Sequence, residues 1–180
     1  LLLEDNSVDA IITSPPYLNA QKYIRTHKLE LLWLGIVTEK ELLALDKKLI
    51  GTEKVSLKQV DFNEQFGIKS IDHLINWTVI ISPVRAALVY NYFQDMRQTI
   101  SEMYRVLKNN AYAILVVGNN TVLKKKVETY RLLTDLATSM GFREILILKD
   151  NIRCRSMITK RHNSGGLIKE EYVIVFKKEK

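Results

Sequence analysis

Apolar residues recur along this chain at two different spacings, and these spacings predict where the strands and helices lie. An apolar run from Val8 to Thr13 predicts a strand, and the near-continuous apolar run Ala111–Val117 predicts a second, of the kind buried on both faces of a parallel sheet. Phe142–Leu148 and Glu171–Lys177 predict two further strands, joined by a polar loop with two adjacent glycines.

Helical spacing dominates between these strands. Residues 92–108 predict an amphipathic helix with Asn91 as its N-cap, and residues 126–140 predict another that stops at Gly141. Because helices alternate with apolar strands, the pattern predicts an α/β fold.

A helical region is also predicted after the first strand. Residues 22–35 and 38–49 both read as helices, and the second begins with a capping box formed by Thr38 and Glu41. The whole stretch 37–90 is longer than an ordinary connection. We expect it to be a helical insertion, which either caps the sheet or covers a substrate cleft and contacts the substrate.

The first predicted strand ends in an unusual turn, Ser14-Pro15-Pro16-Tyr17. Proline fixes φ and has no N–H, so the two prolines stop the strand and stiffen the turn. Open α/β sheets bind their ligands at the carboxyl ends of strands, and this is where the turn places its serine and tyrosine. A rigid structural turn, or an exposed proline-rich ligand segment, is the alternative reading.

This turn resembles motif IV of the S-adenosylmethionine-dependent amino-methyltransferases of DNA, in the form associated with N4-cytosine enzymes. Adenine-N6 enzymes more often have Asp or Asn in the first position. The passage Tyr104–Tyr112 and the closing pair of strands are similar to the same family. The resemblance implies the C-terminal portion of a Rossmann-like methyltransferase sheet, strands four to seven with an antiparallel final hairpin, plus the helical insertion.

The chemistry of amino-group methylation gives each residue of the turn a predicted role. The Ser14 hydroxyl and the Pro15 carbonyl would accept hydrogen bonds from the amino group of a flipped base, preferably cytosine. Pro16 would stiffen the turn, and Tyr17 would stack on the base. Direct transfer needs no covalent enzyme intermediate. For the cofactor, S-adenosylmethionine, the sequence offers Thr13 and Asn119 at the ends of two strands.

The glycine-rich cofactor turn of this family has no counterpart in the sequence. The chain has seven glycines and no Gly-x-Gly. We therefore expect strands one to three of the family's sheet to lie outside these residues, and another chain or a second copy to complete the sheet. A catalytically incomplete domain that binds nucleic acid or a partner is the alternative from another class. Methylation of adenine, RNA or protein remains open within the enzyme class, as does membership of a restriction–modification system.

The composition of the chain limits the partners and the cellular location that we expect. The net charge of +7 is compatible with double-stranded DNA as partner. We expect phosphate contacts from four side chains in the loop before the last strand: Arg153, Arg155, Lys160 and Arg161. Lys124–Lys126 read as a solvated face. The sequence has no metal-ligand cluster and no apolar run long enough for a membrane span, and its single cysteine favours a reducing, cytoplasmic location.

Overall fold

The computed structural model describes residues 2–18, 23–52, 55–57, 60–152 and 168–179. Its centre is a four-stranded sheet in the order β1-β2-β6-β5, formed by β1 (Val8–Thr13), β2 (Leu107–Gly118), β6 (Glu170–Lys178) and β5 (Phe142–Asn151). β1 is parallel to β2, and β6 is antiparallel to both β2 and β5. The predicted α/β fold with an antiparallel final pair of strands is confirmed.

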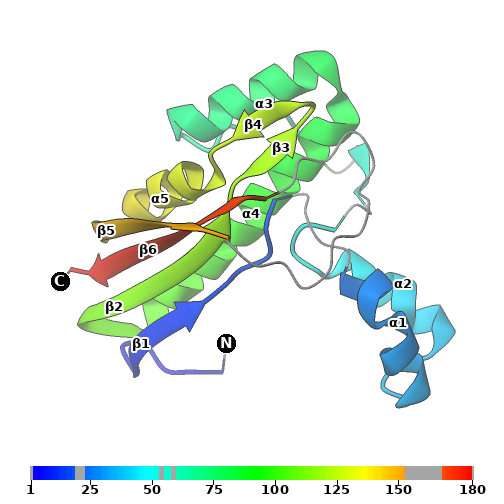
Figure 1. The fold of residues 1–180 in the computed structure, drawn as a ribbon, viewed down its shortest axis with the longest axis horizontal. Coiled ribbons are helices and arrows are strands. Elements are labelled where there is room, and N and C mark those ends of the chain that lie inside the picture. The colour runs from blue at the N-terminus through cyan, green and yellow to red at the C-terminus, as the bar shows by residue number, and fades with distance from the viewer. Residues whose placement is uncertain (1, 19–22, 53–54, 58–59, 153–167, 180) are drawn as a thin grey trace.

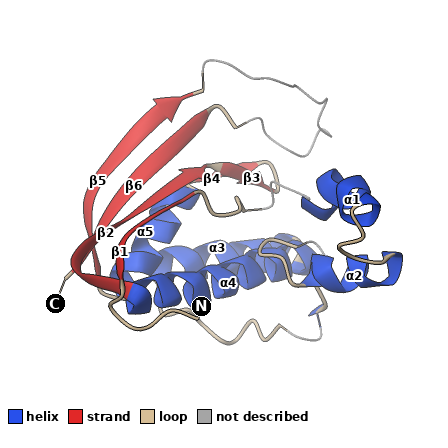
Figure 2. Cartoon of the chain, turned by 90° about the horizontal axis from the view of Figure 1, so that it is seen from below, coloured by secondary structure: helices blue, strands red, loops and turns tan. Residues whose placement is uncertain are grey.

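Three helices form a single layer on one face of this sheet: α3 (Lys69–Ile81), α4 (Pro83–Val106) and α5 (Thr129–Ser139) (Figures 1 and 2). The core lies between this layer and the sheet, where Phe93, Met96 and Ile100 of α4 are at most 1% exposed. None of the helices in the described ranges combines the length and apolar character needed to cross a membrane.

Only this one face of the sheet is covered by described residues. Along β2, Ala113, Leu115 and Val117 are buried, whereas the side chains between them are only partly buried. The prediction that this strand is buried on both faces is therefore wrong for the described part of the chain. On the other face, Ile12 of β1 is 74% exposed and Leu148 of β5 is 50% exposed. This leaves an apolar surface opposite the helices.

Two shorter helices, α1 (Tyr23–Trp33) and α2 (Glu39–Lys47), lie away from the sheet in both ribbon views (Figures 1 and 2). Both agree with the predicted helical segments. At the start of α2, the backbone N–H of Thr38 donates to the Glu41 carboxylate at 2.7 Å, which confirms the capping interaction.

The long central helix begins earlier than the sequence pattern predicts. α4 starts at Pro83 with Ser82 as its N-cap, and the Ser82 hydroxyl accepts a hydrogen bond from the Arg85 N–H at 3.4 Å. Asn91, the predicted N-cap, lies within the helix instead. Burial of Ala86 and Val89 explains the extension, because these side chains continue the apolar stripe toward the N-terminus. Proline at the first helical position is also a favourable start.

The segment before α5 is the second correction. Residues 126–128 are not helical, and α5 begins at Thr129. Instead, β3 (Asn120–Val122) and β4 (Lys125–Val127) form a short antiparallel hairpin directly after β2. The turn glycine that usually identifies such a hairpin is absent, so the sequence gives no local signal for it.

The start of α4 gives a first testable prediction. Ser82→Ala removes the side-chain acceptor at the helix N-terminus and should lower the free energy of unfolding by about 0.5–2 kcal/mol. Asn91→Ala is the matched control and should not destabilise the protein, because Asn91 is an interior helical position where alanine is favoured. Urea denaturation measures both. A larger loss for Asn91→Ala than for Ser82→Ala would contradict this helix start.

Candidate active site

The Ser14–Tyr17 turn leaves the sheet at the carboxyl end of β1, beside the carboxyl end of β2. The parallel register pairs Thr13 with Leu115, so Ser14 lies level with the next residue of β2. There the Ser14 hydroxyl donates a hydrogen bond to the carbonyl oxygen of Val116 at 3.0 Å. The single hydroxyl hydrogen is used in this contact, so the oxygen lone pairs of this exposed residue remain available as acceptors.

The two prolines of the turn have different environments. The Pro16 carbonyl accepts a hydrogen bond of 3.0 Å from the hydroxyl of Tyr92, whose side chain is only 1% exposed on α4. The Pro15 carbonyl accepts no hydrogen bond from any described residue. The turn is therefore fixed on one side by the core, while the carbonyl of the buried Pro15, next to Ser14, has no partner among the described residues.

Tyr17 is held by contacts from the carboxyl end of β2 and the amino end of β6, which are paired with each other. Its hydroxyl donates to the Glu171 carboxylate at 2.8 Å. Its ring packs on Gly118, where an added Cβ would lie 2.8 Å from Cε2 of the ring and 2.9 Å from Cγ2 of Ile168. A side chain at position 118 would therefore push the tyrosine ring out of place. Tyr17 as a whole is partly buried.

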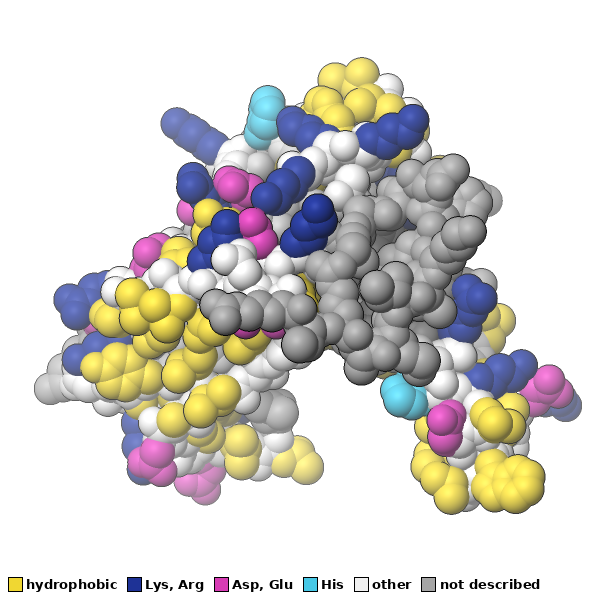
Figure 3. Space-filling model, viewed as in Figure 1, with side chains coloured by type: hydrophobic (Ala, Val, Ile, Leu, Met, Phe, Trp, Pro, Cys, Tyr) yellow, Lys and Arg dark blue, Asp and Glu magenta, His cyan; other side chains and the backbone are white. Residues whose placement is uncertain are grey.

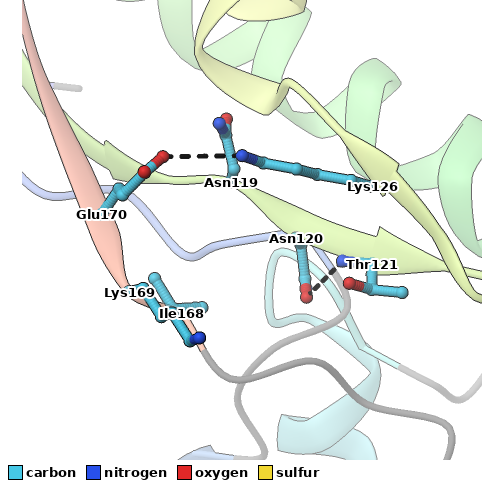
Figure 4. A pocket seen from close by; sticks show the side chains of 7 residues that line it. All are labelled: Asn119, Asn120, Thr121, Lys126, Ile168, Lys169 and Glu170. Carbon is cyan, nitrogen blue, oxygen red and sulfur yellow. Dashed lines mark hydrogen bonds and ion pairs between the residues drawn. The ribbon is translucent and has the colours of Figure 1, made fainter.

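A pocket of about 210 Å³ opens next to this turn, at the end of β2 (Figure 4). It is lined by Asn119, Asn120, Thr121, Lys126, Ile168, Lys169 and Glu170. Asn119 is 7% exposed, and neither its amide oxygen nor its amide nitrogen has a hydrogen-bond partner in the described part of the chain. Buried amides are nearly always paired, so this one fits a bound polar group. The structure thus places Asn119, a predicted cofactor residue, in a pocket.

Glu170 gives this pocket its negative charge. Its carboxylate pairs with Lys149 at 2.7 Å and with Lys126 at 3.5 Å, and it accepts a hydrogen bond from the Tyr172 hydroxyl at 3.1 Å. The hydrogen bond from Lys149 is the main reason that the pKa of Glu170 lies below its ordinary value of 4.5. The carboxylate therefore stays ionised at neutral pH.

The predicted site residues are thus brought together in part. Ser14–Tyr17, Thr13 and Asn119 lie at the same edge of the sheet, at the ends of adjacent strands. Arg153, Arg155, Lys160 and Arg161 lie outside the described residues, so their predicted contact with DNA remains a prediction.

Sequence reasoning missed the residues that hold the turn in place. Gly118, Tyr92 and Glu171 contact it from three other elements, and the Asn120 amide donates to the carbonyl of Leu18 directly after it. Only Gly118 carried a local signal, as a glycine that ends a buried strand. The others are distant in sequence, and no local pattern identifies them.

The relatives found by comparison with known proteins are type II methyltransferases. The chain is 28% identical over 169 residues to the type II methyltransferase M.BsoBI of Geobacillus stearothermophilus, which covers 81% of this chain and 33% of that protein. It is 29% identical to the type II methyltransferase M.AvaI of Nostoc sp., over 94% of this chain and 38% of the relative. A third relative, M.MvaI of Kocuria varians, is 27% identical over 74% of this chain and 31% of its own length.

These relatives are similar in sequence along most of the chain, which spans about a third of their length. The predicted resemblance to DNA methyltransferases is confirmed. A solved structure of a candidate DNA modification methylase from Thermus thermophilus, in complex with S-adenosyl-L-methionine, aligns with 99% of this chain and 49% of its own, at 11% identity and a TM-score of 0.47. No family model matches the chain.

The charge state of Glu170 gives a prediction on pH. The pKa of this carboxyl is lower in the folded chain than its unfolded value of 4.5, so the unfolded state binds a proton first. The stabilisation is therefore complete above pH 4.5 and is lost as the pH falls through the lowered pKa. Glu170→Gln should flatten the fall in stability below pH 4.5, measured by urea denaturation at a series of pH values. The matched control is Glu144→Gln, which removes an exposed carboxylate on β5. This variant should show a fall in stability below pH 4.5 that is closer to that of the native protein. An equal fall in stability below pH 4.5 for the native protein and Glu170→Gln would contradict the lowered pKa of Glu170.

Proposed function

We propose that the protein, a relative of type II DNA methyltransferases, transfers a methyl group from S-adenosylmethionine to the exocyclic amino group of a DNA base, and that this base is cytosine, methylated at N4. One observation carries the proposal. The Ser14 hydroxyl oxygen and the neighbouring Pro15 carbonyl, which accepts no hydrogen bond from the described residues, follow the carboxyl end of a parallel strand, next to the fixed ring of Tyr17.

The arrangement suits an amino group that is a poor nucleophile. The lone pair of an exocyclic amino group is delocalised into the base, so the nitrogen must be drawn toward tetrahedral geometry before it can attack. Two acceptors that hold the two N–H bonds achieve this, because they are oriented before the reaction begins. The Val116 carbonyl orients the Ser14 oxygen, and the prolines keep their own turn out of the sheet ladder.

Tyr17 has a separate role in positioning the base. A base that has left the duplex loses its stacking partners, and stacking on an aromatic ring restores about 1–3 kcal/mol. Gly118 and Glu171, which face each other on the paired strands β2 and β6, fix the orientation of the ring. Since alignment of the reactants contributes a large share of the rate in such reactions, a fixed ring favours transfer without a covalent intermediate.

The cofactor, when bound, supplies an electrophilic methyl group. Asn119 fits a role in holding one of its polar groups, because its buried amide lacks a partner among the described residues and borders the pocket at the end of β2. Thr13, one residue before the turn, is the second cofactor contact that we propose. We also propose, as expected from the sequence, that another chain or a second copy completes the sheet.

The function is tested by the reaction product. The full gene product is incubated with duplex DNA and S-adenosylmethionine labelled in the methyl group, and the digested nucleosides are identified by mass analysis. We expect label in N4-methylcytosine, and none with Ser14→Ala. Label in N6-methyladenine would keep the reaction class and overturn the choice of base. Cofactor binding without label on DNA would direct attention to RNA or protein substrates, and absence of cofactor binding would favour a nucleic-acid-binding domain without activity.

A double-mutant cycle tests the role of the tyrosine ring. Gly118→Ala displaces the ring and should reduce the rate of transfer by about 100-fold, the effect of a misplacement of about 1 Å. Tyr17→Ala should reduce it similarly. If Gly118 acts through the ring, then Gly118→Ala in the Tyr17→Ala background should have little further effect on rate. Fully additive losses in the double variant would show that Gly118 acts by another route.

A further inference from the structure

The hairpin β3–β4 presents a concentrated positive charge at the catalytic edge of the sheet. Its sequence, Asn120–Val127, contains three consecutive lysines and no acidic residue. It begins two residues after β2 ends at Gly118, the residue on which Tyr17 packs. Figure 1 shows the hairpin at this end of β2, and Figure 3 shows Lys and Arg side chains gathered over the same region.

The hairpin is attached to the residue that directly follows the Ser14–Tyr17 turn. The buried side chain of Asn120 donates a hydrogen bond from its amide to the carbonyl of Leu18, the residue that follows Tyr17. The amide oxygen of the same side chain accepts a hydrogen bond of 2.8 Å from the N–H of Thr121. Both the nitrogen and the oxygen of this amide therefore hold the base of the hairpin in place. From Asn120 to the hairpin tip is about 10 Å, at the usual rise per residue of a strand. This corresponds to about three base-pair steps along DNA.

The tip of the hairpin has an unfavourable backbone conformation. Val122 pairs with Lys125, so Leu123 and Lys124 form a two-residue connection, with φ values of 49° and 65°. Both values lie in the left-handed region, which such turns require and which asparagine and glycine adopt most easily. Leucine and lysine are poor choices for folding at these positions. A strained residue with a charged side chain at the edge of a site is an indication of function.

The three lysines differ in how strongly they are engaged. Lys124 at the tip has no acidic partner among the described residues. Lys125 lies over the ring of Trp77, with its amino nitrogen 4.6 Å from the ring centroid. Lys126 shares the Glu170 carboxylate with Lys149, and its distance of 3.5 Å is the longer of the two. The single Glu170 carboxylate therefore neutralises only part of the positive charge of the surrounding lysines.

We infer that this hairpin binds backbone phosphates of DNA beside the target base, with Lys124 and Lys125 as the main contacts. The inference rests on the proposed function, since it takes DNA as the substrate. Phosphate contacts fix the position of a protein on the duplex without reading its sequence. Because Asn120 ties the hairpin to the residue after Tyr17, a phosphate bound at the tip would fix the distance between the DNA backbone and the acceptors that hold the base.

Salt dependence of binding gives the most direct test. The dissociation constant of the full gene product for a fluorescent duplex is measured between 50 and 200 mM salt, for the native protein and Lys124→Gln/Lys125→Gln. Each phosphate contact contributes about 0.9 to the slope of log affinity against log salt, so the variant should lose about 1.8. Its defect in affinity should thus be about 12-fold larger at 50 mM than at 200 mM salt.

The matched control changes the same net charge at the other end of the sheet. Lys108 and Arg143 lie near the amino ends of β2 and β5, away from the turn. Lys108→Gln/Arg143→Gln should keep the native salt slope. An equal loss of slope in the two double variants would show a general effect of net charge and would overturn the inference.

A second variant separates binding from folding. Leu123→Asn/Lys124→Gly installs residues that favour the left-handed turn, so it should raise the melting temperature while lowering DNA affinity. A higher melting temperature with unchanged affinity and slope would overturn the inference.

If the native protein methylates DNA but Lys124→Gln/Lys125→Gln keeps the native salt slope, the hairpin is a solvated face and the proposed function stands. If the native protein neither binds nor methylates DNA, both proposals fail together, and the native control alone shows it.

Discussion

The parallel pairing of β1 with β2 is the contact on which the rest of the site depends. It sets the level at which the chain leaves the sheet, since Thr13 lies opposite Leu115 and Ser14 reaches the carbonyl of Val116. A shift of one residue would turn the side chains of β1 to the opposite face and remove this hydrogen bond. It would also separate Tyr17 from the glycine on which its ring packs. Register, rather than any single side chain, therefore places the acceptors and the ring.

The helical layer on one face of the sheet helps to hold this register. α4 buries one apolar stripe from Ala86 to Val106, and it contributes the Tyr92 hydroxyl that binds the carbonyl of Pro16. Tyr92 and Phe93 pack edge to face at 5.2 Å between ring centroids, both almost fully buried. The prolines have removed donors from the turn, so its backbone depends on partners from the core. Core packing and the shape of the candidate active site are thus one structural unit.

The edge of the sheet combines fixed and unpaired polar groups within a short distance. Ser14, Tyr17 and Asn120 have defined partners, whereas the Pro15 carbonyl and the Asn119 amide have none among the described residues. Fixed groups keep the geometry, and unpaired buried groups favour a ligand that completes their hydrogen bonds. The lysines of the hairpin add positive charge to the same edge. Both features agree with the DNA substrate that we propose, which has a polar base and a charged backbone.

The sequence by itself determined the local elements and the residues of the turn. The apolar run before Ser14, the stripe in α4 and the capping box of α2 are local patterns, because strand alternation, helical spacing and proline act over a few residues. Tertiary structure decided the rest. Tyr17 meets Glu171 and Tyr92 meets Pro16 across 154 and 76 residues, and no periodicity encodes such pairs. The hairpin after β2 forms without a turn glycine, because attachment to Leu18 and packing of Val122 and Val127 in the core compensate for an unfavourable tip.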